Sequence, residues 1–322
     1  MLNQPSASTR PGASTPKPGG ALVIGEALVD VVPADQGARE LPGGSPLNVA
    51  VGLGRLGRSV TLATWLGEDN HGALITEHLR RSGVVLSPGS DAADHTSSAR
   101  VSFDQAGSGH YVFDLAWDLP AMPADLAPLT VHVGSLGATV SPGGRKVLAT
   151  VLANPWAATI TYDPNVRPQL MGAAAAARPE IEAYVGAADV VKASHEDLEW
   201  LYPDRSALES ARSWLGMGPD LVVVTMGAQG ALALGAADRS ARIGVTPGPV
   251  ADTVGAGDSF MSALIHWLWE EDLLGPGRQD ALRHLGADQL QRLLAFASAA
   301  AAITVSRPGA EPPWLHELPA PS

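Results

Sequence analysis

The sequence contains no cysteine among its 322 residues. This absence excludes thiolate-ligated zinc, iron–sulfur clusters and thiol nucleophiles, and nothing indicates an oxidising compartment. Lysine is scarce as well, and occurs only as Lys17, Lys146 and Lys192. Because we expect Lys17 to lie in a tail, a lysine dedicated to a substrate must be Lys146 or Lys192.

Long hydrophobic runs and an excess of positive charge are also missing. The longest nearly apolar run, Leu293 to Val305, is shorter than the ~20 residues that a membrane-spanning helix needs. The first apolar run does not fit a signal peptide, because Gly25 and Glu26 follow it at once. The 21 basic residues against 33 acidic ones give a net charge of −12. An acidic surface repels nucleic acid and anionic membranes, so we expect neither as a partner. Without a signal peptide or a sign of an oxidising compartment, we expect a cytoplasmic protein.

What is present is a globular composition, 45% hydrophobic, in a chain long enough for two domains or one large one. Residues 1–20 are rich in Ser, Thr, Pro and Gly, and we interpret them as a disordered tail. Between residues 21 and 318 strand-like runs alternate with helical patterns, which predicts a parallel sheet covered by helices. The expected strands are 21–24, 28–32, 59–65, 130–133, 159–162, 189–192 and 221–225. The expected helices are 46–56, 71–82, 145–153, 179–187, 197–202, 207–215, 256–269 and 289–302.

One segment departs from this alternation. Residues 99–113 read as two short strands that turn on Gly107 and Gly109. Such a pattern predicts a β-hairpin, which inside an α/β chain is a candidate lid or dimer element.

The most informative stretch runs from Asp252 to Phe260 and precedes an amphipathic helical pattern. The small residues Gly255, Ala256 and Gly257 allow backbone N–H groups to converge at the start of that helix, where the helix dipole also favours an anion. Asp258 places a carboxylate in the same turn. An anion hole beside a carboxylate is what phosphoryl transfer to an alcohol requires.

Five segments resemble signatures of the ribokinase-like, or PfkB, family of carbohydrate kinases. Residues 252–258 resemble its DTxGAGD signature. The others, in the order of the family, are 25–30 (the opening strand, in the form usual for fructokinases), 43–50 (GGxxxN), 163–167 (DxNxR) and 225–230 (TxGxxG). The resemblance implies a three-layer α/β/α sandwich with a mainly parallel central sheet. It also implies a small β-sheet lid near residues 30–41 and 99–113, through which two copies would pair as a homodimer.

The same resemblance assigns roles to single residues. Asp258 becomes the general base on a sugar hydroxyl, and Gly255, Ala256 and Gly257 become the anion hole. A carboxylate is a weak base near neutral pH, so we expect its work to be mostly positioning, with the proton leaving late. The residues assigned to the sugar are Asp30, Gly43, Gly44, Asn48, Asn165 and Arg167. Ser45 followed by Pro46 also fits an N-cap residue and the first residue of a helix.

The nucleotide and metal assignments also follow from the resemblance. Lys192 and Ser194 fall near the nucleotide phosphates, and Thr225, Gly227 and Gly230 form a nucleotide loop. Where ribokinases carry NxxE, this chain has Ser194 and Asp197, so either Glu196 or Asp197 would organise the Mg²⁺ that accompanies ATP. Asp252 and the loop at residues 307–310 correspond to a K⁺ site in some members.

The resemblance predicts an ATP-dependent sugar kinase, and fructose is the substrate that it favours. The alternatives are 2-keto-3-deoxygluconate or ribose, and, from another class, a catalytically silent sugar-binding member. The sequence Gly52-Leu-Gly54-Arg-Leu-Gly57 matches GxGxxG, but it ends a helical pattern instead of opening one, which disfavours a dehydrogenase. The absence of GxxxxGK[ST] excludes a P-loop kinase.

Overall fold

The computed structural model describes residues 19–34, 37–103, 109–123, 125–245 and 248–319. The predicted tail therefore lies outside the described residues, except for Gly19 and Gly20. The larger of two sheets has nine strands in the order β13-β12-β11-β10-β9-β8-β1-β4-β5. These are β1 (Ala21–Ile24), β4 (Val60–Ala63), β5 (Val84–Leu86), β8 (Thr130–Gly134), β9 (Thr159–Asp163), β10 (Val190–Ser194), β11 (Leu221–Thr225), β12 (Ala231–Gly235) and β13 (Ser240–Ile243).

Seven of these strands run parallel, and β12 and β13 add an antiparallel edge. Parallel strands are covered on both faces, which is why their sequences read as continuous apolar runs. Strands β1 and β11 have the predicted bounds. Strands β5 and β13 were not predicted because they lie at the two edges of the sheet, and β12 was not predicted because its Ala-Leu-Ala-Leu-Gly sequence lacks β-branched and aromatic residues.

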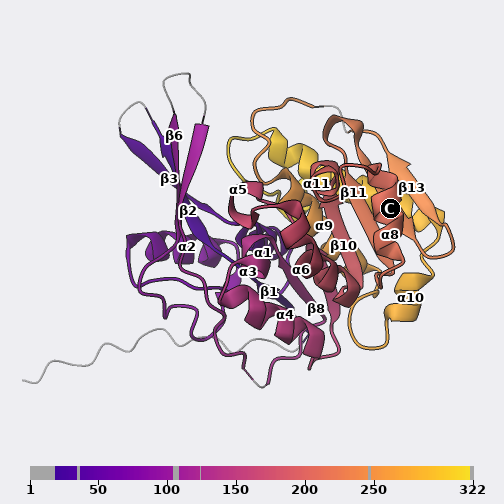
Figure 1. The fold of residues 1–322 in the computed structure, drawn as a ribbon, viewed down its shortest axis with the longest axis horizontal. Coiled ribbons are helices and arrows are strands. Elements are labelled where there is room, and N and C mark those ends of the chain that lie inside the picture. The colour runs from indigo at the N-terminus through magenta and orange to yellow at the C-terminus, as the bar shows by residue number, and fades with distance from the viewer. Residues whose placement is uncertain (1–18, 35–36, 104–108, 124, 246–247, 320–322) are drawn as a thin grey trace, which may run out of the picture.

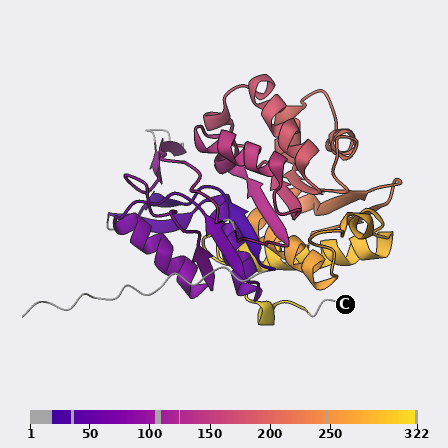
Figure 2. The same cartoon turned by 90° about the horizontal axis from the view of Figure 1, so that it is seen from below.

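Helices cover both faces of the large sheet, as Figure 2 shows from below. One layer packs residues of α1 (Ser45–Arg55), α2 (Asn70–Arg81), α9 (Ala256–Glu270) and α11 (Ala287–Val305) into one core cluster. The other packs residues of α4 (Gly143–Ala153), α6 (Ala174–Ala187), α7 (His195–Leu201) and α8 (Ala207–Leu215) into a second. The short helices α3 (Ser135–Thr139), α5 (Pro168–Met171) and α10 (Gln279–Arg283) lie in connections. The predicted three-layer α/β/α sandwich is confirmed.

A smaller sheet stands away from the sandwich (Figure 1). Its order is β3-β2-β6-β7, with β2 (Leu28–Pro33), β3 (Ala38–Gly43), β6 (Ser98–Phe103) and β7 (Gly109–Asp114). Both segments predicted as lid strands lie in it. The prediction that Gly109 forms part of the turn was wrong, because Gly109 begins β7 and pairs with Phe103. Gly107 lies outside the described residues.

The GxGxxG sequence serves helix packing. Gly52 lies in α1, and a Cβ there would come within 2.3 Å of Ser262 Oγ on α9, while a Cβ on Gly54 would come within 2.1 Å of the Ser82 carbonyl. Gly57 follows the end of α1 with a φ of +81°, as expected for a residue that terminates a helix. Both helices begin at the candidate site, so the close approach of α1 to α9 sets the relative position of their first turns.

Six of the eight predicted helices begin one to five residues earlier in the structure, and α6 differs most. Helix α6 begins at Ala174 instead of Pro179, because an alanine-rich segment with high helix propensity extends it towards the N-terminus and leaves Pro179 inside the helix. Ser45 does not cap α1 with its side chain. Gly44 occupies the cap position, which leaves the Ser45 hydroxyl free for another partner.

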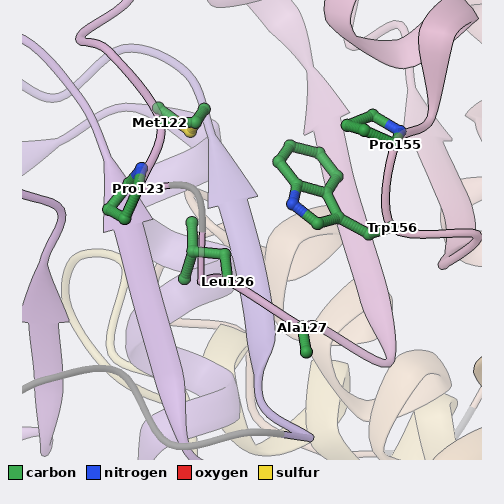
Figure 3. A pocket seen from close by; sticks show the side chains of 6 residues that line it. All are labelled: Met122, Pro123, Leu126, Ala127, Pro155 and Trp156. Atoms are coloured by element: carbon green, nitrogen blue, oxygen red, sulfur yellow. The ribbon is translucent and has the colours of Figure 1, made fainter.

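An apolar cavity of about 420 Å³ lies beside the amino ends of β8 and β9 (Figure 3). Its lining residues are Met122, Pro123, Leu126, Ala127, Pro155 and Trp156. The candidate residues named above all lie elsewhere, towards the carboxyl ends of the strands or on the helices and loops that follow them. Among the described residues, no helix combines the length and the apolar character needed to cross a membrane.

Candidate active site

The parallel strands of the large sheet bring the predicted site residues to one edge. Asp163 ends β9, Ser194 ends β10 and Thr225 ends β11, and Ser194 pairs directly with Thr225. Ligands of open α/β sheets bind outside the carboxyl ends of the strands. The N-terminal turn of α9 meets the same edge and supplies Asp258.

The turn before α9 has the geometry of an anion site. Gly255 is the cap residue with a φ of +75°, and a Cβ there would come within 2.5 Å of Ala310 Cβ, so only glycine fits. No side-chain oxygen caps the helix, and the Ala256 N–H makes only a long bond, 3.4 Å to the Thr253 carbonyl, so this turn can still donate to a ligand. With Ala256 and Gly257, this turn therefore offers backbone donors and the positive end of a helix dipole.

The Asp258 carboxylate is buried and collects hydrogen bonds from distant parts of the chain. Ser45 Oγ donates to its Oδ1 at 2.6 Å, and Asn48 Nδ2 donates to its Oδ2 at 2.8 Å. Asn165 Nδ2 lies 3.4 Å from Oδ1. The structure thus joins Asp258 to two residues predicted to bind sugar. It also adds Ser45, which sequence reasoning had interpreted only as a helix cap.

Asp30 lies on β2, with its carboxylate against the start of α1. A Cβ on Gly43 would come within 2.2 Å of Asp30 Oδ2, so glycine makes room for this carboxylate. Gly44 has a φ of +106°, and a Cβ there would come within 2.7 Å of the Glu26 carbonyl. Burial raises the pKa of Asp30 to about 6, and the positive charge of Arg167 opposes this rise.

Arg167 is exposed, but its guanidinium is held by its own loop. Nη1 donates to Asn165 Oδ1 at 2.6 Å, to the Asn165 carbonyl at 3.1 Å and to the Val166 carbonyl at 3.0 Å. Its charge also lowers the pKa values of Asp30 and Glu26. The guanidinium therefore already donates to oxygens of its own loop and interacts electrostatically with two carboxyl groups of the protein.

Glu26 is a buried carboxyl group that sequence reasoning did not assign to the site. Its Oε2 accepts a hydrogen bond from the Gly137 N–H at 2.6 Å, and burial raises its pKa to about 7. The signal was present, because Glu26 belongs to the 25–30 segment that carried the family resemblance. Only the structure places this carboxyl within electrostatic reach of Arg167.

Lys192 is buried beneath the first turn of α9. Its Nζ lies 2.7 Å from Asp163 Oδ2, and a Cβ on Gly257 would come within 3.2 Å of the same nitrogen. Lys146, the other lysine considered, pairs with Asp118 on the surface at 2.7 Å. Of these two lysines, Lys192 is the one at the site.

Ser194 and Asp197 form a reciprocal cap at the start of α7. The Asp197 N–H donates to Ser194 Oγ at 3.0 Å, and the Ser194 N–H donates to Asp197 Oδ2 at 2.7 Å. Asp197 Oδ1 accepts a further bond from the Val166 N–H at 2.8 Å. Glu196, by contrast, has a side chain that is 67% exposed and lies 3.1 Å from His195 Nδ1. The structure therefore brings Asp197 to the site and leaves Glu196 in solvent.

The predicted nucleotide loop follows β11 as a single 3₁₀ turn, Gly227–Gln229. Gly227 has a φ of +50° with open space where a Cβ would stand, and Gly230 has a φ of +87° with the Ile243 carbonyl 1.9 Å from that position. The turn closes with the Met226 N–H bonded to the Gly230 carbonyl at 2.8 Å. Thr225 lies at its base, beside Ser194.

Asp252 lies next to the 307–310 loop, as predicted. Its Oδ2 accepts a bond from the Gly309 N–H at 2.9 Å, and its Oδ1 accepts one from the Val254 N–H at 3.0 Å. These backbone donors hold the pKa of Asp252 below its usual value. An ionised carboxylate thus stands between two loops at the start of α9.

Comparison with known proteins decides the family. Residues 20–317 match the pfkB family of carbohydrate kinases. The chain belongs to this family. It is 32% identical over 270 residues to a fructokinase of Rhizobium leguminosarum bv. trifolii, a match that covers 79% of this chain and 81% of that protein.

Solved structures agree on the fold. A fructokinase of Xylella fastidiosa with bound ATP superposes with a TM-score of 0.74 at 22% identity, covering 93% of this chain and 94% of that one. A double mutant of a Vibrio cholerae fructokinase, bound to fructose, ADP and potassium ion, gives a TM-score of 0.72 at 24% identity, covering 91% and 94%. As a pfkB family member, this chain is an ATP-dependent sugar kinase.

Proposed function

We propose that this protein is a fructokinase that transfers the γ-phosphoryl group of ATP to a hydroxyl of D-fructose. The observation that carries the proposal is the Asp258 carboxylate, which accepts hydrogen bonds from Ser45 and Asn48. Asp258 lies in the first turn of α9, a helix without a side-chain cap. The relative at 32% identity, named fructokinase, supports fructose as the sugar.

In the proposed mechanism Asp258 accepts the proton of the attacking hydroxyl. Ser45 and Asn48 fix the direction of the carboxylate, so its oxygens meet the hydroxyl without having to reorient. The N–H groups of Gly255, Ala256 and Gly257 stabilise charge on the transferring phosphoryl group. Because the transition state of such transfers is loose, most of the rate comes from positioning and charge stabilisation.

The surroundings of Arg167 favour a neutral sugar over a sugar acid. A carboxylate substrate would need a cation free to bind it bidentately. Arg167 already uses one terminal nitrogen, Nη1, to donate to Asn165 and Val166, and its charge interacts with the carboxyl groups of Asp30 and Glu26. Adding a third carboxylate would cost repulsion, which disfavours 2-keto-3-deoxygluconate.

Mg²⁺ fits the site as a partner of ATP, supplying charge neutralisation to the phosphates. The described residues contain no cluster of three acidic or histidine side chains for a metal. This suits an ion held mainly by phosphate oxygens and water. We propose that Asp197, rather than Glu196, orients that water, because Asp197 interacts electrostatically with Asp163 and Lys192. A K⁺ ion would fit beside the ionised Asp252.

We also propose that the smaller sheet closes over the sugar and excludes water, which otherwise competes as the phosphoryl acceptor. Asp30 lies on β2 of that sheet, so closure would carry a carboxylate that binds the sugar towards the rest of the site. We propose further that two such sheets pair in a homodimer. We also propose a cytoplasmic location, where ATP is supplied.

An assay of ADP release over a panel of sugars tests the function. We expect the fastest release with fructose, and slower release with ribose and 2-keto-3-deoxygluconate. Asp258→Asn should lower kcat by about 10²–10⁴-fold. Asp272→Asn is the matched control, because its exposed carboxylate follows the other end of α9.

Three results would change the conclusion. Faster ADP release with ribose or 2-keto-3-deoxygluconate than with fructose would identify that compound as the substrate in place of fructose. Sugar binding without ADP release from any sugar would identify a silent binding protein. Full activity of Asp258→Asn would refute the role given to this carboxylate.

A further inference from the structure

A fully buried ion pair underlies the candidate site. Lys192 Nζ and Asp163 Oδ2 are 2.7 Å apart, and the two side chains are 4% and 0% exposed. Burying an ion pair contributes little to stability on average, because desolvation offsets the attraction. The pair lies between the end of β9, the middle of β10 and the first turn of α9, and this location points to a role in the site.

Asp163 connects the pair to the loop that carries Asn165. Its Oδ1 accepts the Asn165 N–H at 3.2 Å, and Asn165 has a left-handed φ of +38°, a conformation that Asn adopts more readily than most side chains and that such a local hydrogen bond supports. Asn165 Nδ2 in turn lies 3.4 Å from Asp258 Oδ1. Asp163 thus helps to hold the backbone in the conformation that directs Asn165 at Asp258.

Lys192 is enclosed on its remaining sides. A Cβ on Gly257 would come within 3.2 Å of its Nζ, and the residue is only 3% exposed. The negative charges of Asp163, Asp197 and Asp258 all raise its pKa, against the effect of burial. The ammonium therefore balances three carboxylates and presents little surface to a nucleotide.

We propose that Lys192 and Asp163 act as one positioning unit, which holds Asn165 against Asp258 and supports the first turn of α9. Phosphates of the nucleotide are bound by the backbone amides of that turn and not by the Lys192 ammonium. This inference rests on the proposed function for its kinetic readout, but its binding readout is independent of the sugar.

The test is a double-mutant cycle with Lys192→Met, Asp163→Asn and both together. If the pair acts through Asn165, each single change should lower kcat by on the order of a hundredfold, as a misplaced group does. The double variant should lose about as much as one single variant, since both act through one contact. The Kd values for ADP and for a non-hydrolysable ATP analogue, which carries the third phosphate, should both stay within about threefold of the parent protein in every variant when measured by calorimetry.

Lys146→Met is the control, because it removes a lysine from an exposed pair of the same length, Lys146–Asp118. It should change neither kcat nor either Kd. Should Lys192→Met fail to fold, Asp163→Asn carries the test, since it preserves the side-chain shape and an oxygen for the Asn165 N–H.

Two results would overturn the proposal. Losses in kcat that multiply in the double variant would show that Lys192 and Asp163 act separately. A rise of more than about tenfold in either Kd in Lys192→Met alone would show that Lys192 binds the nucleotide. If fructose is not the substrate, kcat is measured with whichever sugar releases ADP. If none does, the two Kd values still decide whether Lys192 binds phosphate.

Discussion

Asn48 Nδ2 donates a hydrogen bond to Asp258 Oδ2 at 2.8 Å, across 210 positions of sequence. The bond joins the first turns of α1 and α9, which the close contact at Gly52 and Ser262 holds together. One end of the bond belongs to the segment assigned to the sugar and the other to the segment assigned to phosphoryl transfer. Positioning of the sugar and of the carboxylate is therefore a single structural property of the α1–α9 pair.

Ser45 provides the first test of this view. Ser45→Ala removes the donor at 2.6 Å from Asp258 Oδ1 and leaves Asn48 in place. The carboxylate then loses one of the bonds that fix its direction, so kcat should fall by about tenfold while the KM for ATP stays nearly constant. Steady-state kinetics measure both. Thr150→Ala, which removes an exposed hydroxyl on α4, is the control and should leave both constants unchanged. An unchanged kcat in Ser45→Ala would contradict the role of this hydroxyl.

The raised pKa of Glu26 should make the free energy of unfolding depend on pH. The folded pKa of this carboxyl group is raised to about 7 by burial, from an ordinary value of 4.5. Between these two values the folded protein binds more protons than the unfolded chain. The free energy of unfolding should therefore fall as pH rises from about 4.5 to about 7, by at most about 3 kcal/mol from this group.

Denaturant unfolding at several pH values measures this slope. Asp30 and Asp163 have folded pKa values raised to about 6 and contribute in the same direction at lower pH. The decisive comparison is therefore Glu26→Gln, which should flatten the part of the curve nearest pH 7. Identical slopes in the parent and in Glu26→Gln would show that Glu26 does not titrate in this range.

Much of the fold and part of the site could be predicted from the sequence, for identifiable reasons. Apolar strands and amphipathic helices have strong local signals, and β1, β11 and α8 have the predicted bounds. The contacts that assemble the site are long-range. Nothing local to Ser45 indicates that its hydroxyl turns to Asp258, and nothing near Lys192 indicates that its partner is Asp163. Ordinary turn chemistry explained Ser45 equally well until the structure showed its partner.

Asp197 and Glu196 are adjacent carboxylates, but we expect only the substitution of Asp197 to change the kinetics. Asp197→Asn replaces one of the oxygens that accept the Val166 and Ser194 N–H groups, so it should loosen the loop that carries Asn165 and lower kcat by about tenfold or more. It should also raise the Mg²⁺ concentration needed for half-maximal rate. Glu196→Gln should change neither quantity, because its side chain lies in solvent. A Mg²⁺ titration of both variants checks this, and the reverse pattern would assign the metal water to Glu196.

Gly43 and Gly186 form a matched pair for a final prediction about backbone space. A Cβ on Gly43 would lie 2.2 Å from Asp30 Oδ2, so Gly43→Ala must displace the carboxylate proposed to bind the sugar. The KM for fructose should rise by at least about tenfold, with the KM for ATP nearly unchanged, because the predicted nucleotide loop follows β11 of the large sheet whereas Gly43 and Asp30 lie in the smaller one. Gly186 lies in α6, where the nearest atom to a Cβ is the Met217 carbonyl oxygen at 3.6 Å. Gly186→Ala should leave kinetics unchanged and stabilise the protein by about 0.5–1 kcal/mol, since alanine favours helix. Equal KM values for fructose in the two variants would show that Asp30 does not contribute to sugar binding.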